Sequence, residues 1–215
     1  MADALLHGYF RSSTAFRVRI ALNLKGVSYD QTFRHLRKGE QRAPDYLKLN
    51  PQGLVPTLEI DGQTLTQSLA IIEYLEETRP NPAFLPKDAA GRARVRSLSY
   101  ALALEIHPIN NLRVLQDLGT RFGANDEAQA GWFRHWVDTT FGALEQRLAN
   151  EKETGKFCHG DTPTLADICL VPQVFNAQRF QCPLDAYPTI VRIHAACQKL
   201  DAIDRARPER QPDAV

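Results

Sequence analysis

The sequence predicts an α+β protein with two parts, the first mixing strands with helices and the second all helical. Short apolar runs separated by turn residues recur over the first third of the chain and favour strands. A linker with three closely spaced prolines follows, and beyond Gly91 apolar residues recur with helical spacing almost to the end. We therefore expect one domain over residues 1–84 and an all-helical domain over residues 85–215.

The chain opens with a strand, a helix and a second strand. Residues 5–9 form a short apolar run, and the segment 11–14 offers several helix-capping side chains. A helical pattern then extends over residues 15–25 and ends at Gly26, a residue type that favours helix C-termini. Residues 29–35 have the composition of a strand, so we expect the two strands to flank the helix in sequence.

A weak helical pattern through Leu47 precedes a strong hairpin signal. The pair Asp61-Gly62 separates two strand-like runs, at 57–60 and 63–66, and this dipeptide favours a tight turn between strands. Ser68 follows the second run and is expected to cap a closing helix. The first domain is therefore predicted to have the order βαβαββα.

The second domain contains one clear helix start and all the cysteines. Thr164 and Asp167 have the spacing of a capping box before an apolar run. Because no two cysteines form a Cys-x-x-Cys pair, and the six histidines are scattered, we expect reduced, mostly buried thiols and no metal site. The four cysteines are Cys158, Cys169, Cys182 and Cys197.

The composition indicates a globular protein whose expected partner is a small molecule or another copy of itself. With 215 residues, 43% of them hydrophobic, the chain can bury a sizeable core. Lys and Arg number 26 against 25 Asp and Glu, with no block of like charges, so nucleic acid and membrane surfaces are not expected partners. The N-terminus lacks the pattern of a leader and no apolar run has the length to cross a bilayer, so we expect a cytoplasmic location.

Six segments together resemble one protein family over nearly the whole chain. These are residues 11–22, 50–58, 67–75, 107–111, 164–173 and 210–213. The chain resembles the zeta class of glutathione transferases, whose best-known members are maleylacetoacetate isomerases. The resemblance implies a thioredoxin-like N-terminal domain, an all-α C-terminal domain, glutathione as cofactor and a homodimer.

Three hydroxyl side chains at the start of the first helix are the expected catalytic group. Glutathione reacts as its thiolate, and a helix N-terminus favours an anion through its N–H groups and dipole. The resemblance implies that Ser12 donates to the sulfur and that Ser13 and Thr14 support it. On their own, the three residues would be ordinary helix caps.

The resemblance also implies the residues that hold the cofactor. The Val55-Pro56 bond is expected to be cis, with the Val55 backbone pairing with the cysteinyl part of the tripeptide. Gln67 and Ser68 are expected to hold the γ-glutamyl carboxylate at a second helix start, and Gln52 to make a further contact.

Two residues of the second domain complete the expected cofactor site. The resemblance assigns His107 and Asn111 to it, and their spacing of four places both on one helix face. Without the resemblance, His107 would be a helix-end residue beside a proline and no more.

The implied reaction is a glutathione-dependent cis–trans isomerisation. Maleylacetoacetate would become fumarylacetoacetate, a step of aromatic amino-acid breakdown, by reversible addition of the glutathione thiolate to the double bond. A small dicarboxylic diketo acid needs cationic groups, and the resemblance implies Arg11, Arg113 and Arg179. Most arginines are solvated surface charges, and this is the alternative for these three. For Arg17 and Arg19, an ion pair at an interface or at the surface and a catalytic role have equal weight.

Three alternatives to this function remain open. Thr14 stands where the zeta pattern usually has cysteine, and related bacterial maleylpyruvate isomerases tend to have threonine there, so maleylpyruvate is the nearest alternative substrate. A general zeta-class glutathione transferase acting on electrophiles is the second alternative. The third is a non-catalytic module, since a fold alone guarantees no reaction.

Overall fold

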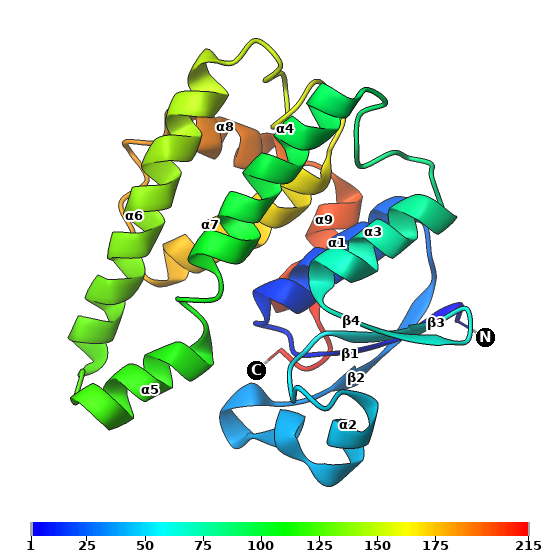
Figure 1. The fold of residues 1–215 in the computed structure, drawn as a ribbon, viewed down its shortest axis with the longest axis vertical. Helices are drawn as coiled ribbons and strands as arrows, with labels where there is room; N and C mark the ends of the chain where they lie inside the picture. The colour runs from blue at the N-terminus through cyan, green and yellow to red at the C-terminus, as the bar shows by residue number, and fades with distance from the viewer. Residues whose placement is uncertain (1, 215) are drawn as a thin grey trace. The chain divides into compact units, whose positions relative to one another are not determined.

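The computed structural model describes residues 2–214 and divides them into two compact units (Figure 1). The first unit contains the described residues up to Phe84 together with those from Gln198 onward, and the second contains Leu85–Cys197. The break after Phe84 lies where the sequence places the domain boundary. Residues 198–214 group with the first unit and not with the helical part, because helix α9 (Asp201–Ala206) packs on helix α1 (Ser13–Lys25).

A four-stranded mixed sheet forms the base of the first unit. Its order is β2-β1-β3-β4, with β1 parallel to β2 and antiparallel to β3. Leu6 on β1 lies opposite Leu58 on β3, and both side chains are fully buried. Asp61 and Gly62 both have positive φ, as the predicted tight hairpin turn requires. The strands are β1 (Ala4–Gly8), β2 (Tyr29–Phe33), β3 (Thr57–Ile60) and β4 (Gln63–Thr66).

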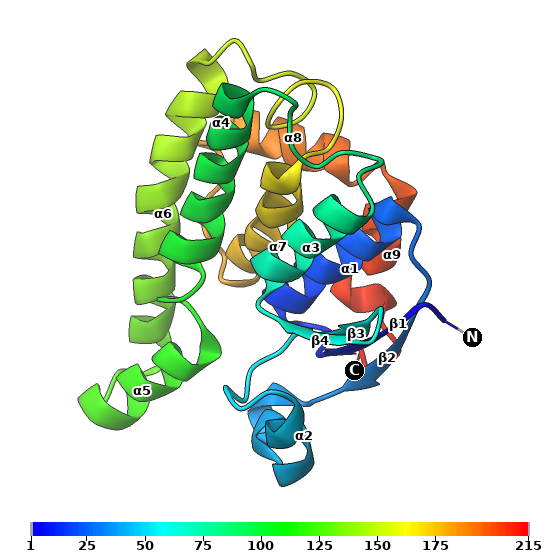
Figure 2. The same cartoon turned by 45° about the vertical axis from the view of Figure 1, so that its right-hand side comes forward.

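Helix α1 is buried almost all round. Every residue from Ala15 to Leu22 is buried, which is typical of a helix enclosed on all sides. Helices α1, α3 and α9 lie on one side of the sheet and α2 on the other (Figure 2). The predicted order βαβαββα is confirmed. The remaining helices of this unit are α2 (Pro44–Leu49), α3 (Ser68–Thr78) and three 3₁₀ turns, Leu36–Lys38, Glu40–Arg42 and Pro208–Arg210.

The start of α3 corrects one expectation. Ser68 is the first helical residue and Gln67 is the N-cap, so Ser68 does not cap the helix as predicted. Gln67 has a φ of 67°, outside the range that a residue with an ordinary cap conformation adopts. The chain therefore enters α3 one residue earlier, through a strained backbone.

The second unit is all helical, as expected. Helix α7 is its central element, because it packs against both α4 and α8 and most of its residues are buried. Among the described residues, no helix has the length and apolar character needed to cross a bilayer. The helices are α4 (Ala89–Tyr100), continued by a π-helical segment (Ala101–Ile106), α5 (Leu112–Phe122), α6 (Asp126–Asn150), α7 (Leu165–Arg179) and α8 (Pro188–Cys197).

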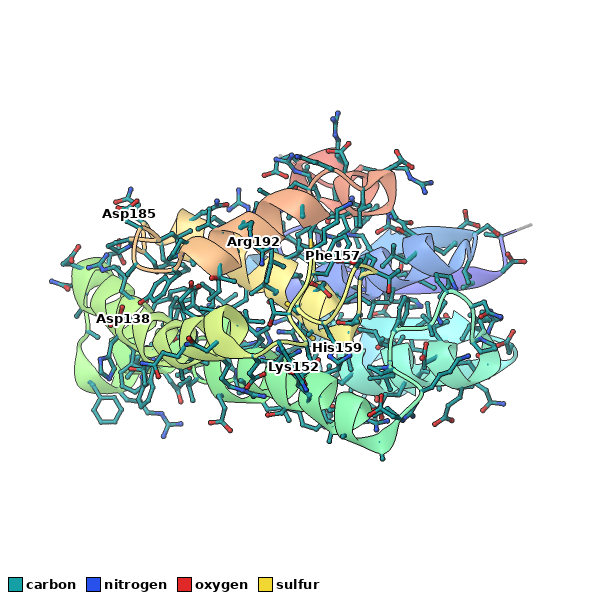
Figure 3. The ribbon with its side chains drawn as sticks, turned by 90° about the horizontal axis from the view of Figure 1, so that it is seen from above. Asp138, Lys152, Phe157, His159, Asp185 and Arg192 are labelled. Atoms are coloured by element: carbon teal, nitrogen blue, oxygen red, sulfur yellow. The ribbon has the colours of Figure 1, made fainter. Side chains whose placement is uncertain are left out.

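The loop between α6 and α7 is anchored by two arginines. Arg192 on α8 donates to the carbonyl oxygen of Gly155 at 3.0 Å. Arg94 on α4 donates to the carbonyl oxygen of Cys158 at 2.8 Å and to the Glu151 carboxylate at 2.5 Å. Figure 3 shows Phe157 and His159 on this loop and Arg192 on the neighbouring helix. The loop therefore enters α7 from a defined position.

The predicted capping box at the start of α7 is confirmed. Asp167 is fully buried, and its Oδ2 accepts from the backbone N–H of Thr164 at 2.8 Å and from the Thr164 hydroxyl at 2.9 Å. Its Oδ1 accepts from the backbone N–H of Cys158 at 2.8 Å. All four cysteines are buried free thiols, and burial raises the pKa of Cys158 well above its usual value. One carboxylate thus joins the end of the loop to the helix.

Asp167→Ala should destabilise the protein strongly. It leaves the backbone N–H groups of Thr164 and Cys158 buried without an acceptor, at roughly 1–3 kcal/mol each, so we expect a loss of about 2–6 kcal/mol. Urea unfolding followed by circular dichroism measures the loss. Asp185→Ala, which removes an exposed carboxylate from the same unit, is the matched control. Equal unfolding midpoints for the two variants would contradict the role given to Asp167.

Candidate active site

The three predicted hydroxyl residues lie at the N-terminus of α1, where the helix leaves the sheet. Ser12 is the N-cap, and its Oγ accepts from the backbone N–H of Ala15 at 3.2 Å. Ser12 Oγ also lies 2.8 Å from Thr14 Oγ1. Ser12 and Ser13 are buried, and Thr14 is partly exposed. Ser12 therefore has the cap role that its residue type predicts, together with a second polar neighbour.

The Thr14 hydroxyl decides where the Ser12 proton points. Thr14 donates its single O–H to the carbonyl oxygen of Val55 at 2.9 Å. Between the two hydroxyls, Ser12 must then be the donor, and Thr14 Oγ1 the acceptor. Since Ser12 Oγ already accepts from Ala15, its one O–H is the group available to a ligand that displaces Thr14 as acceptor.

Val55 brings a second segment of the chain to this point. The Val55-Pro56 peptide bond is cis, as the resemblance predicts. Val55 is buried in a cluster with Tyr9, Phe10 and Tyr46. The start of α1 and the loop before β3 are thus joined both by a hydrogen bond and by apolar packing.

Gln52, Gln67 and Ser68 form a second part of the predicted site. Gln67 Nε2 donates to Gln52 Oε1 at 2.8 Å, and both residues are exposed. Gln67 holds φ 67° and ψ 113°, a conformation that costs a non-glycine residue on the order of 1–3 kcal/mol. Strain of this kind is concentrated at ligand-binding positions, and here it precedes a helix start that favours an anion.

Of the interpretations left open for Arg17 and Arg19, the solvated surface charge is wrong, because both side chains are buried. Arg17 and Arg19 are each 1% exposed. Arg17 Nη1 lies 3.5 Å from Ser68 Oγ, so a guanidinium supports the N-terminus of α3 from within the unit. The sequence contained one indication that Arg17 points toward the site: it follows Ser13 by four residues and therefore lies on the same helix face.

Arg11, expected to bind substrate, lies directly before the hydroxyl group. It is partly exposed, and its guanidinium carbon is 4.8 Å from the centre of the Phe10 ring. A cation over an aromatic face is attracted to the ring, so Phe10 constrains the direction of this side chain. The first unit therefore brings Arg11, Ser12 and Thr14 into one short segment.

In the second unit, two of the predicted residues are in contact. Asn111 Nδ2 is 3.3 Å from His107 Nε2, and because an amide N–H only donates, the ring nitrogen accepts. Asn111 also caps α5 by accepting from the backbone N–H of Arg113 at 3.2 Å. Arg113 and Arg179 both have exposed side chains, at the start of α5 and the end of α7. Arg113 thus contacts the His107–Asn111 pair through its backbone N–H, while Arg179 Nη1 donates to Asn176 Oδ1 at 3.3 Å.

A cavity of about 380 Å³ in the second unit contains none of the predicted residues. Within it, Tyr187 donates a hydrogen bond to Asp138, which Figure 3 shows on α6. Burial, with the Asp138 carboxylate, raises the pKa of Tyr187 to about 12, and burial raises the pKa of Cys182 to about 11. A thiol with that pKa is a poor nucleophile near neutral pH, so Cys182 gives this cavity no reactive thiolate.

The two helix starts of the first unit fit an anionic thiol ligand. One presents a hydroxyl whose proton can turn to a sulfur atom, and the other presents a strained entry, a buried hydroxyl and a guanidinium. Both lie next to exposed or partly exposed side chains, so a ligand can reach them. The arrangement supports binding and lowering of a thiol pKa, which thiolate chemistry needs.

Comparison with known proteins gives matches over both units. Residues 11–78 match the N-terminal domain of glutathione S-transferases, and residues 119–205 match their C-terminal domain. A probable maleylacetoacetate isomerase of Vibrio cholerae serotype O1 is 48% identical over 217 residues, covering 100% of both chains.

Two solved structures are similar along their full length. A holo structure described as a maleyl pyruvate isomerase, a bacterial glutathione S-transferase of the zeta class, has 50% identity and a TM-score of 0.97, covering 98% of this chain and 100% of that one. A maleylacetoacetate isomerase of Methylobacterium extorquens AM1, with bound malonate and GSH, has 45% identity and a TM-score of 0.94, covering 98% and 99%.

These findings confirm the predicted fold, with a thioredoxin-like sheet unit and an all-helical unit. The likeness is far above the level at which only the fold is shared, and it extends over the whole of the relatives. The chain therefore belongs to the glutathione S-transferase family, in its zeta class.

Proposed function

We propose that this protein is a glutathione-dependent isomerase that converts maleylacetoacetate to fumarylacetoacetate. The observation that carries the proposal is the Ser12 hydroxyl at the start of α1, with its single proton directed at Thr14 and open to capture by a sulfur atom. Relatives named maleylacetoacetate isomerase match the whole chain, which supports the choice of substrate. When bound, glutathione supplies a thiol sulfur that adds reversibly to the double bond of the substrate.

Ser12 has the central catalytic role in this proposal. Its O–H leaves Thr14 Oγ1 and donates to the sulfur, which stabilises the thiolate over the thiol. Thr14 keeps its own bond to Val55 and so fixes the distance between the hydroxyls and the loop before β3. Ser13 supports the same helix start, whose dipole favours negative charge.

Cofactor binding is assigned to the residues around Val55 and the start of α3. The Val55 backbone and Pro56 would hold the cysteinyl part of glutathione, and Ser68 with the α3 N-terminus would hold the γ-glutamyl carboxylate. Gln52 and Gln67, which already contact each other, contribute amide groups. From the second unit the proposal adds His107 and Asn111, the hydrogen-bonded pair.

Substrate binding is assigned to three arginines. A dicarboxylic diketo acid carries negative charge that a guanidinium can pair bidentately, and Arg11, Arg113 and Arg179 are exposed or partly exposed. The maleylacetoacetate isomerase of Methylobacterium extorquens AM1 was solved with GSH and with malonate, which is a small dicarboxylate. The proposal also includes a homodimer in the cytoplasm, by resemblance to the family, and light scattering would measure the mass of the assembly.

Isomerisation should be visible directly in the ultraviolet. Purified protein is added to maleylacetoacetate and, separately, to maleylpyruvate, each with and without glutathione. We expect a glutathione-dependent absorbance change with maleylacetoacetate as the faster substrate. A faster rate with maleylpyruvate would assign the alternative substrate, to which the relative with 50% identity points. Silence with both acids, from protein that binds glutathione, would remove the isomerase function.

Ser12→Ala should lower turnover far more than it lowers glutathione binding. Loss of one hydrogen bond to a charged sulfur costs about 1.5–3 kcal/mol, so we expect roughly a 10- to 100-fold fall in kcat. Calorimetric Kd for glutathione should change little, because the carboxylate contacts remain. Ser28→Ala, at an exposed serine of the same unit, is the control for losing a hydroxyl. Parallel losses in kcat and in glutathione affinity would remove Ser12 from the catalytic role.

Arg11→Ala and Arg113→Ala should each raise the KM for the acid by about tenfold, the size expected when one charged hydrogen-bonding group is lost. The KM for glutathione should stay within about twofold, since neither arginine is assigned to the cofactor. Arg121→Ala is a matched control, because Arg121 lies on α5 with Arg113 and pairs with Asp117 at the surface. If both variants behave like the control, the substrate carboxylates bind elsewhere.

A further inference from the structure

The peptide groups of Phe10 are held from both sides by charged side chains. Its backbone N–H donates to Asp213 Oδ2 at 2.9 Å. Its carbonyl oxygen accepts from Arg19 Nη2 at 3.0 Å. Phe10 directly precedes Arg11 and Ser12, so these two bonds restrain the backbone that leads into the proposed site.

Arg19 connects this point to the C-terminal segment a second time. Its Nε donates to the carbonyl oxygen of Ala206 at 2.9 Å, at the end of α9. Burial lowers the pKa of Arg19 to about 10, so the side chain remains a cation near neutral pH, and the nearby Asp213 carboxylate favours its charged form. A buried cation and a partly buried anion therefore flank the backbone of Phe10.

The segment that carries Asp213 is itself fixed to the first unit. Gln211 is buried, and its Nε2 donates to the carbonyl oxygens of Arg205 and Arg207 at 2.9 and 2.8 Å. Its Oε1 accepts from Gln31 Nε2 on β2 at 3.1 Å. Both ribbon views show the segment after α9, drawn in red, passing beside β1 and β2 (Figures 1 and 2). Asp213 is thus presented to Phe10 by a braced turn and not by a loose tail.

The same turn packs on the apolar cluster below the site. The backbone N–H of Ala214 donates to the carbonyl oxygen of Gln211 at 3.0 Å, and Ala214 packs against the cluster that includes Phe10 and Val55. Phe10 in turn lies under the Arg11 guanidinium, and the Ser12 N–H donates to the carbonyl oxygen of Tyr9 at 2.9 Å. These contacts therefore connect Asp213, through Phe10 and the apolar cluster, to Arg11, Ser12 and Val55.

We propose that Asp213, acting with Arg19, is a positioning residue that holds the Phe10–Ser12 backbone in the geometry needed to stabilise the thiolate and to direct Arg11. This inference rests on the proposed function of Ser12 and Arg11. Small misplacements of reacting groups are costly, and groups that hold reactive side chains are needed nearly as much as the side chains themselves. A carboxylate suits this place, because a charged acceptor makes a stronger bond to a backbone N–H than a neutral one.

A role in overall stability alone would make different predictions. Asp213 accepts one backbone N–H, and its Oδ1 is buried without a hydrogen-bond donor among the described residues. A carboxylate oxygen in that state is costly, and the attraction between Asp213 and the buried Arg19 guanidinium offsets part of this cost. The bond from Asp213 restrains one short segment, residues 10–12. Loss of this bond should therefore change the thiol pKa and the kinetic constants, which depend on Ser12 and Arg11, more than it changes the melting temperature.

The test compares Asp213→Ala, Asp213→Asn and Asp213→Glu with Glu209→Ala, a control that removes an exposed carboxylate from the same segment. Ultraviolet titration of the protein with bound glutathione gives the thiol pKa, which needs no acid substrate. Kinetics with maleylacetoacetate give kcat and KM separately. Circular dichroism and thermal melting report the folded fraction to which every value is normalised.

Asp213→Ala should raise the pKa of the bound thiol and lower kcat/KM about tenfold, the size expected for one lost hydrogen bond to a charged group. Asp213→Asn keeps an oxygen acceptor for Phe10 and should recover most of the loss. If Asp213→Ala yields no folded protein, Asp213→Glu, with its carboxylate displaced by one methylene, should show the same direction of change.

The positioning role would be overturned if folded Asp213→Ala, or Asp213→Glu, had a thiol acid dissociation constant and a kcat/KM that were both within twofold of the values for Glu209→Ala. Wild-type protein that binds glutathione but does not isomerise either acid would overturn the proposed function, while the thiol pKa would still decide the role of Asp213. Wild-type protein that binds no glutathione would overturn both.

Discussion

The enclosure of α1 is the constraint on which the rest of the first unit depends. A helix buried from Ala15 to Leu22 has no solvated face, so its polar side chains must find partners inside the protein. Arg17 meets Ser68 at the start of α3, and Arg19 meets backbone carbonyls of the Phe10 segment and α9. Burial of the two guanidinium charges costs free energy, and their hydrogen bonds connect α1 to the start of α3 and to the Phe10 segment, the two parts of the candidate site.

This enclosure also explains why the chemistry sits at helix ends. The interior of α1 offers no access, but its first turn leaves N–H groups without a partner inside the helix, and a side chain, water or a ligand can satisfy them. Ser12 satisfies one of them and still has a proton to donate. At α3 the chain reaches an equivalent position through the strained Gln67. A rigid, buried helix can therefore place the proposed reactive hydroxyl in its first turn, beside the partly exposed Thr14.

Much of the fold of both units could be predicted from sequence because its signals are local. The Asp61-Gly62 turn, the Gly26 stop and the Thr164–Asp167 box each act within a few residues, and each is found where expected. Ser68 as a partner of Arg17 and Ala206 as a partner of Arg19 were missed because they lie 51 and 187 residues away, a separation that no local pattern reports. For the same reason the C-terminal residues were placed with the helices that precede them in sequence, although their contacts are with α1.

The bond between Phe10 and Asp213 joins residues 203 positions apart, which bears on how the protein is made. The sheet and its hairpin can form once the first 84 or so residues have left the ribosome, since their pairings are all internal to that stretch. The backbone before Ser12 acquires its anionic partner only after Asp213 has also emerged. The four strands can therefore pair before α9 and Asp213 are made, whereas the enclosure of α1 and the restraint on the segment leading to Ser12 are completed only afterwards.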